Sequence, residues 1–238
     1  MVRLSVNVNK VALLRNARGG SIPSLLDFVR KAADFGAQGI TVHPRPDGRH
    51  VLYSDVKFIK RIIDVEFNVE GNPTEDFIAL MLEVKPNQCT LVPDSVDQLT
   101  SNHGWDTIHN VEFLKWEVGR LKAAGIRVSI FVDPKPEMVE GAALVGADRV
   151  ELFTGPYASG FADDPEAAVA PYIECAKVAD RLKLGLNAGH DLNLQNLPLL
   201  KKKLPNLLEV SIGHALICDA LYMGLEKAIK EYLHILRK

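Results

Sequence analysis

Short runs of β-branched and other apolar residues recur along the chain, and each is followed by a longer stretch in which apolar residues have helical spacing. The runs predict eight strands, at residues 4–8, 39–42, 65–69, 88–92, 127–132, 149–152, 183–186 and 208–212. The stretches between them predict helices at residues 24–33, 56–63, 74–83, 111–123, 136–144, 165–182, 194–202 and 214–236. Several runs are nearly continuous in Val, Ile and Leu, as in strands that are covered on both faces.

Strands that alternate with helices form parallel sheets, because a parallel connection needs a crossover. Eight such units in 238 residues favour a single (β/α)8 TIM-barrel domain over residues 1–238, of α/β class, with room for extra short helices. An open doubly wound sheet has fewer strands as a rule, and the chain has neither a G-x-G-x-x-G nor a P-loop motif. Gly36, Gly125 and Gly146 lie between a helix and the next strand, where a left-handed helix cap is expected.

Composition and charge limit the possible partners and the expected location of the protein. The formal net charge of −2, with acidic and basic residues interspersed, argues against nucleic acid as the main partner. Cys89, Cys175 and Cys218 have neither disulfide-framework nor zinc-site spacing. No apolar run is long enough to span a membrane, and no signal-peptide pattern opens the chain, so we expect a reducing cytoplasm. The basic triplet at residues 201–203 is typical of a solvated helix end.

Polar residues lie at or just past the carboxyl ends of the predicted strands, where barrel enzymes build their sites. In chain order they are Asn7, Asn9, His43, Arg45, Glu70, Thr90, Thr100, Asp133, Glu151, Thr154, Asn187, His190, Ser211, Gly213 and His214. Imidazoles titrate near neutral pH, and carboxyls at an apolar rim acquire raised pKa values, so this set predicts general acid/base chemistry. The long connections after the second and fourth strands are candidate lids.

Phosphate groups are the predicted ligands. Gly213-His214 opens the last helix, where backbone N–H groups and the helix dipole favour an anion. Arg18, Arg45 and Arg49, after the first two strands, offer forked donors to a second anion. A metal bound by His43, Glu70 and His190 stays open as an alternative, although the chain has no H-x-H or H-E-x-x-H spacing.

Six segments give the chain a specific resemblance. They are 14–19 (Leu-Arg-Asn-Ala-Arg-Gly), 39–45 with Arg49-His50, Lys85-Pro86 with 91–93, Glu151 with 154–155 and Tyr157, 187–190 (Asn-Ala-Gly-His), and 212–215 (Ile-Gly-His-Ala). In this order, from near the first residue to the last helix, they resemble the pyridoxine 5′-phosphate synthase family of deoxyxylulose-dependent vitamin B6 biosynthesis.

The resemblance implies a transferase that condenses 3-amino-2-oxopropyl phosphate with 1-deoxy-D-xylulose 5-phosphate, giving pyridoxine 5′-phosphate, phosphate and water. It implies no cofactor and no metal, and a homo-octamer, to which the apolar segment 216–236 adds support. By likeness, His43 and Glu70 accept protons, His190 donates one, and Glu151 stabilises charged intermediates. The substrate-binding residues would be Asn7, Gly213 and His214 for the amino-oxopropyl phosphate or the product, and Arg18, Arg45, His50 and Thr100 for the deoxyxylulose phosphate.

Two places depart from the family's pattern. Asn9-Lys10 stands where Asp-His is usual, and Asp191 stands where Gly is usual. Asn9 and Lys10 can still hydrogen-bond the sugar, while Asp191 brings a carboxylate toward the phosphate or caps the short helix that follows. The alternatives are a phospho-sugar isomerase or lyase, which needs one Glu and one His, and a non-catalytic barrel that binds a phosphorylated B6 compound.

Overall fold

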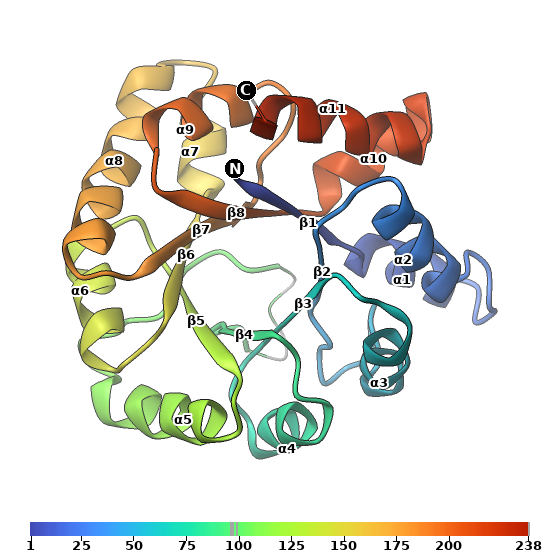
Figure 1. Ribbon diagram of the computed structural model, residues 1–238, viewed down its shortest axis with the longest axis horizontal. Helices are drawn as coiled ribbons and strands as arrows, with labels where there is room; N and C mark the ends of the chain where they lie inside the picture. The colour runs from blue at the N-terminus through green and yellow to red at the C-terminus, as the bar shows by residue number, and fades with distance from the viewer. Residues whose placement is uncertain (96–97, 99, 238) are drawn as a thin grey trace.

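The computed structural model describes residues 1–95, 98 and 100–237, in which eight parallel strands close into a barrel in chain order (Figure 1). The strands are β1 (Arg3–Asn7), β2 (Gly39–Val42), β3 (Glu66–Gly71), β4 (Gln88–Leu91), β5 (Arg127–Val132), β6 (Arg149–Phe153), β7 (Gly185–His190) and β8 (Leu207–Ile212). β8 pairs with β1 in parallel and completes the ring. The predicted (β/α)8 architecture is confirmed.

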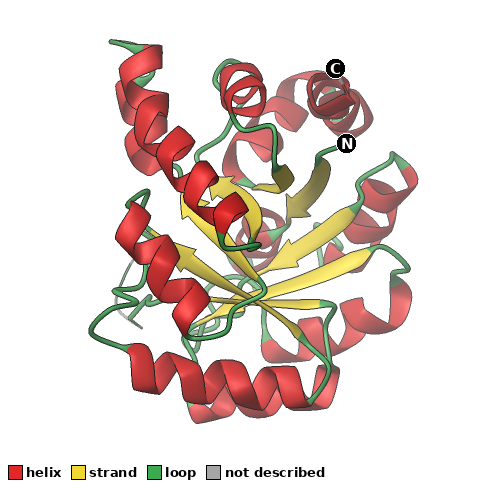
Figure 2. Ribbon diagram, turned by 60° about the vertical axis from the view of Figure 1, so that its left-hand side comes forward, coloured by secondary structure: helices red, strands yellow, loops and turns green. Residues whose placement is uncertain are grey.

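Helices surround this barrel on the outside (Figure 2). They are α1 (Asn9–Asn16), α2 (Leu25–Asp34), α3 (Tyr53–Ile62), α4 (Glu75–Val84), α5 (Val111–Ala123), α6 (Pro136–Leu144), α7 (Gly155–Gly160), α8 (Pro165–Arg181), α9 (Leu197–Lys203), α10 (His214–Met223) and α11 (Leu225–Arg237). α1 and α7 are the short extra helices for which the sequence left room without locating them.

The continuous helix predicted over 214–236 is wrong. Gly224 has a φ of 84° and separates α10 from α11. The apolar side of α11, which includes Ile229, Tyr232 and Leu233, is buried within the chain itself. That side therefore covers the barrel and gives no support for an assembly. The positive φ values of Gly36, Gly125 and Gly146 confirm the predicted left-handed helix ends.

The barrel axis is polar, and strands such as β2, β4 and β6 are covered on both faces as their apolar runs predicted. Side chains alternate along a strand, so every second residue points inward. Apolar positions face the helices, whereas Ser5, Thr41, Asn68 and Thr90 are buried and hydrogen-bond in sequence across β1 to β4. The polar groups at the carboxyl ends of the strands belong to the same inward-facing rows. They form the last layer of the polar axis.

The amino ends of the strands hold an ion-pair network. Arg3 contacts Glu66 at 2.5 Å and Glu209 at 3.5 Å, and Arg127 also pairs with Glu66. Burial is the main cause that lowers the pKa of Arg127 to about 10 and raises the pKa of Glu209. Opposite charges contributed by β1, β3, β5 and β8 thus offset part of the desolvation cost at this end of the axis.

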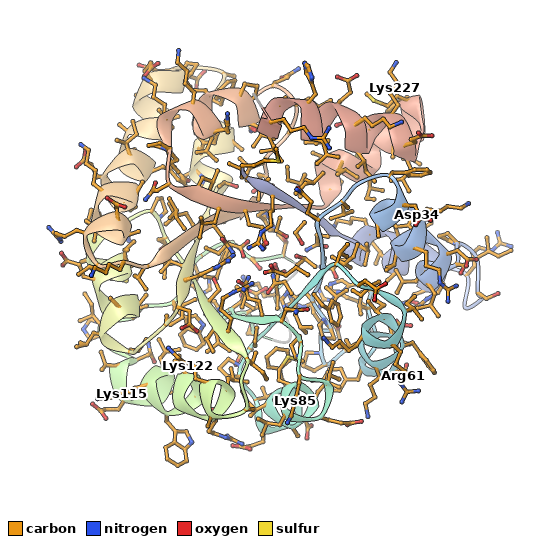
Figure 3. The ribbon with its side chains drawn as sticks, viewed as in Figure 1. Asp34, Arg61, Lys85, Lys115, Lys122 and Lys227 are labelled. Carbon is orange, nitrogen blue, oxygen red and sulfur yellow. The ribbon has the colours of Figure 1, made fainter. Side chains whose placement is uncertain are left out.

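Charged side chains lie on the outside of the barrel. Those labelled in Figure 3 are Asp34, Arg61, Lys115, Lys122 and Lys227 on helices, and Lys85 just after α4. Both signs occur around the rim, in keeping with the small net charge. Among the residues that the structure describes, no helix is long and apolar enough to cross a membrane.

Candidate active site

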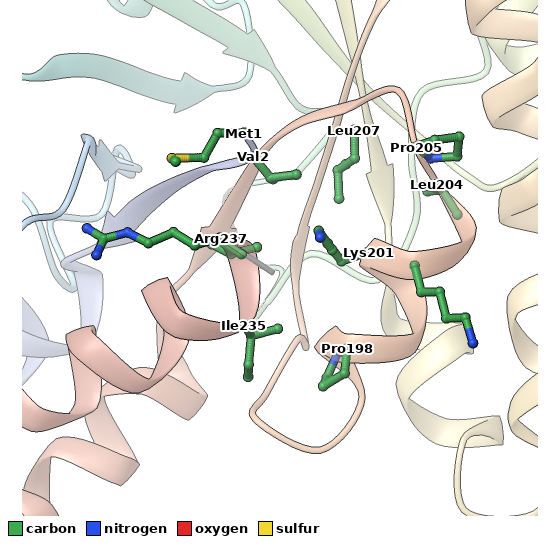
Figure 4. Close-up of a pocket in the computed structure, with 11 residues that line it drawn as sticks. Met1, Val2, Pro198, Lys201, Leu204, Pro205, Leu207, Ile235 and Arg237 are labelled. Atoms are coloured by element: carbon green, nitrogen blue, oxygen red, sulfur yellow. The ribbon is translucent and has the colours of Figure 1, made fainter.

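Two cavities lie at opposite ends of the barrel. One of about 730 Å³, between α9, α11 and the start of β1 and β8, is lined by apolar groups and by Lys201, Lys202 and Arg237 (Figure 4). The other, of about 410 Å³, opens at the carboxyl ends of the strands. Its lining includes all four predicted acid/base residues, which are His43, Glu70, Glu151 and His190. Because proton transfer needs such groups together, the second cavity is the candidate active site.

Glu70 on β3 and Glu151 on β6 are two carboxyls in the wall of the same cavity. Among the described residues neither carboxyl has a hydrogen-bond or ion-pair partner, and Glu151 is 3% exposed. Burial and then the charge of Glu209 raise the pKa of Glu151 to about 8. Burial and then the charge of Glu151 raise the pKa of Glu70 well above its ordinary value. Glu151 can therefore hold or release a proton near neutral pH, and Glu70 keeps its proton to a higher pH than an ordinary carboxyl does.

A glycine on β7 makes room for the Glu151 carboxyl. A Cβ on Gly189 would lie 2.5 Å from Glu151 Oε1 and 2.8 Å from the carbonyl oxygen of Ser211. Any larger residue would displace the acid or separate β7 from β8. The glycine of the Asn-Ala-Gly-His segment thus lets the Glu151 carboxyl lie close to the backbone of β7.

His43 and His50 are both held as neutral imidazoles. Burial, followed by the charges of His50 and Arg45, lowers the pKa of His43 well below its ordinary value. Burial, followed by Arg45 and Lys10, lowers the pKa of His50 to about 4. The two rings meet edge to face with centroids 6.1 Å apart. A neutral imidazole has a free lone pair, so His43 is in the form that accepts a proton.

His190 ends β7 in a constrained position. Its φ of 93° is in the region that favours glycine, a strain of about 1–3 kcal/mol that the surroundings must offset. Nδ1 lies 2.8 Å from Asp191 Oδ2, Nε2 lies 2.9 Å from Thr100 Oγ1, and the ring packs edge-on against Phe153. Asp191 does not cap α9, which corrects one sequence expectation, because Asn196 occupies that position.

The connection after β4 reaches across the barrel mouth. Thr100 follows β4, yet it contacts His190 at the end of β7, three strands away. The connection is also bound to the end of β5, because the Gly104 N–H donates to Asp133 Oδ1. The predicted lid thus lies over the cavity; three of its residues, 96, 97 and 99, lie outside the described residues.

Arg45 fastens this connection to the loop after β2. Its guanidinium donates to Asp94 at 2.8 Å and to the carbonyl oxygens of Ser95 and Gln98. Arg45 and Asp94 are both nearly excluded from water. Arg45 lines the cavity as expected, although its hydrogen bonds to Asp94, Ser95 and Gln98 hold the β4 connection. Sequence reasoning missed Asp94, and also Ser101, which lines the cavity and donates to Asp94.

The Arg-Asn pair of segment 14–19 supports the loop that carries His50. Arg15 forms a two-pronged ion pair with Asp55, and Asn16 donates to the carbonyl oxygen of His50 at 2.7 Å. Arg18, by contrast, is exposed and is not among the residues that line the cavity within one chain.

The first strand and the last βα junction complete the wall. Asn7 Oδ1 accepts from the Asn9 N–H, and Asn9 Oδ1 accepts from the His43 N–H. Lys10, at the start of α1, lines the cavity beside them. Gly213 precedes α10, whose first turn, beginning at His214, also faces the cavity. Helix N-termini of this kind attract anions.

The open metal alternative finds no support in the part of the chain that the structure describes. There, no group of three or more His, Cys, Asp or Glu side chains is arranged to hold an ion. His43, Glu70 and His190 share the cavity without forming such a group.

Comparison with known proteins agrees with this geometry. The family model described as "Pyridoxal phosphate biosynthesis protein PdxJ" matches residues 4–238. The chain is 59% identical over 238 residues to a "Pyridoxine 5′-phosphate synthase" of Cytophaga hutchinsonii and 57% identical over 237 residues to one of Bacteroides fragilis, each alignment covering 100% of both chains.

Solved structures show a similar fold at low identity. A thiamine phosphate pyrophosphorylase from Pyrococcus furiosus has a TM-score of 0.64 and 16% identity, covering 99% of this chain and 95% of its own. A phosphoribosylanthranilate isomerase from Thermotoga maritima has a TM-score of 0.61 and 14% identity, covering 100% and 99%. At identities this low, the similarity shows a shared barrel fold alone.

Fold and site together define a TIM-barrel enzyme whose candidate acid/base site lies at the carboxyl ends of its strands. The match over residues 4–238 and the full-length relatives then specify the kind: the chain belongs to the pyridoxal phosphate biosynthesis protein PdxJ family.

Proposed function

We propose that the chain condenses 3-amino-2-oxopropyl phosphate with 1-deoxy-D-xylulose 5-phosphate, releasing pyridoxine 5′-phosphate, phosphate and water. The observation that carries the proposal is the convergence of His43, Glu70, Glu151 and His190 on one cavity in a chain of this family. The cavity of about 410 Å³ is within the range of about 300–1,000 Å³ that small-molecule sites occupy.

The chemistry calls for repeated proton transfer. An amine must add to a ketone, water and phosphate must leave, and a ring must close. His43, as a neutral imidazole, accepts a proton, and His190 donates one. Glu70 is a second acceptor once its carboxyl is ionised, and a cationic amine that enters the cavity favours that ionised form. The same attraction lets the Glu151 carboxylate stabilise positively charged intermediates.

The two phosphorylated substrates would occupy different parts of the wall. Asn7, with Gly213 and His214 at the start of α10, would hold the amino-oxopropyl phosphate, because exposed N–H groups and the helix dipole attract its phosphate. Arg45, His50 and Thr100 would hold the deoxyxylulose phosphate beneath the β4 connection.

Three further residues would tune this binding. Asn9 and Lys10 provide a hydrogen-bonding and a cationic group for the sugar, and Asp191 lies at the wall beside His190. Arg18 would reach a substrate only through another copy of the chain or a movement of the 17–24 connection, because it is outside the cavity lining of one chain.

The direct test mixes chelator-treated protein with both substrates and follows phosphate release and pyridoxine 5′-phosphate by chromatography. We expect product from the wild type, and loss of turnover by at least about 100-fold with retained product binding in Glu70→Gln. Glu231→Gln, an exposed carboxylate on α11, is the matched control and should leave turnover unchanged. Product binding without any turnover in the wild type would refute the synthase and favour a non-catalytic carrier.

We infer that the chain also forms homo-oligomers, as relatives in its family suggest by resemblance. α1 and α10 pack together and expose large apolar groups, of which Leu14 is 57%, Leu221 74% and Tyr222 92% exposed. Burying such a surface would stabilise an assembly. Sedimentation should show a multimer, octameric by the resemblance, that Tyr222→Glu weakens. A monomer-sized wild-type species would refute the inference.

We also propose that the protein is located in the cytoplasm. Cys89, Cys175 and Cys218 are all free thiols, and Cys89 and Cys175 are buried without a disulfide partner. Thiols of this kind persist in a reducing compartment. Fractionation of cells with an antibody to the protein would test this location, and recovery outside the cytoplasmic fraction would contradict it.

A further inference from the structure

The carboxylate next to His190 has no role in the proton transfers described above. Asp191 Oδ2 lies 2.8 Å from Nδ1 of the ring, on the side away from Thr100, which contacts Nε2. The Asp191 N–H is directed to Thr154 Oγ1, and that hydroxyl in turn donates to the Gly189 carbonyl oxygen. The backbone of Asp191 is therefore held between β7 and the residue that follows β6, and its half-exposed carboxylate starts from a fixed position.

We propose that Asp191 is a positioning residue that holds the proton of neutral His190 on Nδ1 and leaves Nε2 as the nitrogen that exchanges protons with the substrate. A carboxylate can only accept a hydrogen bond, so the facing nitrogen must carry hydrogen. An imidazole without such a partner favours the other tautomer. Nε2, on the opposite side of the ring, belongs to the cavity wall with Thr100.

When the ring is protonated, the same contact is an ion pair. The His190 contact is the main cause that lowers the pKa of Asp191, which keeps this carboxyl ionised. Other titratable groups line the same cavity: Lys10 in α1, His43, Arg45, Arg49 and His50 after β2, Glu70 on β3, Glu151 on β6 and His214 at the start of α10. Asp191 hydrogen-bonds the ring directly.

Ring orientation follows from the same contacts. The backbone of His190 has a positive φ, and its ring is held edge-on by Phe153 at a centroid distance of 5.8 Å. Because backbone and ring face are already constrained, the remaining freedom is the choice of tautomer. The carboxylate removes that freedom, as the buried carboxylate does for the base of a serine protease.

The first test needs no substrate. Imidazole ¹⁵N shifts of labelled protein at alkaline pH distinguish the two tautomers, and the signals of His190 among the seven histidines are those missing from His190→Gln. We expect the Nδ1–H tautomer in the wild type and a change toward Nε2–H in Asp191→Asn. A wild-type ring protonated on Nε2, or identical spectra for wild type and variant, would overturn the proposal.

The second test rests on the proposed function and measures kinetics. Asp191→Asn should lower kcat by about tenfold or more with KM nearly unchanged, because the variant no longer fixes the Nδ1–H tautomer that leaves Nε2 to exchange the proton. Asp191→Glu should restore part of kcat. An unchanged kcat, or a change confined to KM, would contradict a positioning role.

A matched control exists in the same chain. Asp106 Oδ2 lies 2.7 Å from His109 Nδ1 in an exposed turn outside the cavity. Asp106→Asn removes an equivalent contact and should leave kcat and its pH profile unchanged. If the wild type makes no product, the proposed function fails, whereas the tautomer measurement still decides the role of Asp191.

Discussion

Replacing the buried acid Glu151 by Gln should make the protein more stable at alkaline pH. The folded state raises the pKa of this carboxyl from 4.5 to about 8. A raised pKa means that the folded state holds the proton more tightly than the unfolded chain does. The stability contributed by that proton is complete below about pH 4.5 and is lost as pH rises through about 8.

The magnitude follows from the same values. At about 1.4 kcal/mol for each pH unit, the rise corresponds to about 5 kcal/mol lost by the wild type between acidic and alkaline pH. Water in the adjoining cavity reduces the desolvation of the ionised form, so a loss of about 2–5 kcal/mol is expected. Glu151→Gln avoids this loss, and it also relieves Glu70 of a neighbouring negative charge.

Urea unfolding at fixed protein concentration, followed by tryptophan fluorescence at pH 5, 7 and 9, measures the effect. The free energy of unfolding of Glu151→Gln should be close to that of the wild type at pH 5 and exceed it by about 2–5 kcal/mol at pH 9. Glu231→Gln, on the exposed side of α11, should follow the wild type at every pH. A difference that does not grow with pH would refute the reasoning.

Two further changes test the packing around the site. Gly189→Ala should lower kcat and cost about 1–3 kcal/mol of stability, because its Cβ would overlap the Glu151 carboxyl. Asp94→Ala should cost about 3–5 kcal/mol in urea unfolding, because it leaves the buried Arg45 guanidinium without its counter-charge.

Each of these changes has an internal control. Gly119→Ala, in α5 with no atom within 4 Å of its added Cβ, should be neutral or stabilising by up to about 1 kcal/mol. Glu83→Ala, which breaks an exposed pair with Lys57, should change stability by less than about 1 kcal/mol. Equal losses in a site variant and its control would show that close packing and burial are not the cause.

Much of the fold could be predicted because the strands differ from the helices in period and composition. β2 and β5 begin and end at the predicted residues, and so do α5 and α6. α1 escaped prediction because it follows β1 at once and no side chain caps its start. α7 escaped because Gly-Pro-Tyr-Ala-Ser-Gly is typical of a turn.

The polar barrel axis was available in the sequence and was missed. Arg3, Ser5 and Asn7 alternate with apolar residues in β1, and Glu66, Asn68 and Glu70 do so in β3. This period of two indicates one polar face per strand. In a closed barrel that face can only point to the axis, so the position of Glu70 as the last residue of an inward row could have been deduced.

What the sequence could not provide is the set of contacts that bring distant loops together. The Arg45 pair with Asp94 spans 49 residues, and Thr100 meets His190 across 90. No local pattern encodes either distance, because each depends on how the β4 connection crosses the barrel mouth. The sequence located Asp191 and offered two roles for it, as a phosphate neighbour or a helix cap. The structure adds the positive φ of His190 and the 2.8 Å contact, which together turn that carboxylate toward the ring. The tautomer of His190 is therefore the property that most directly tests how this site differs from the family's usual pattern.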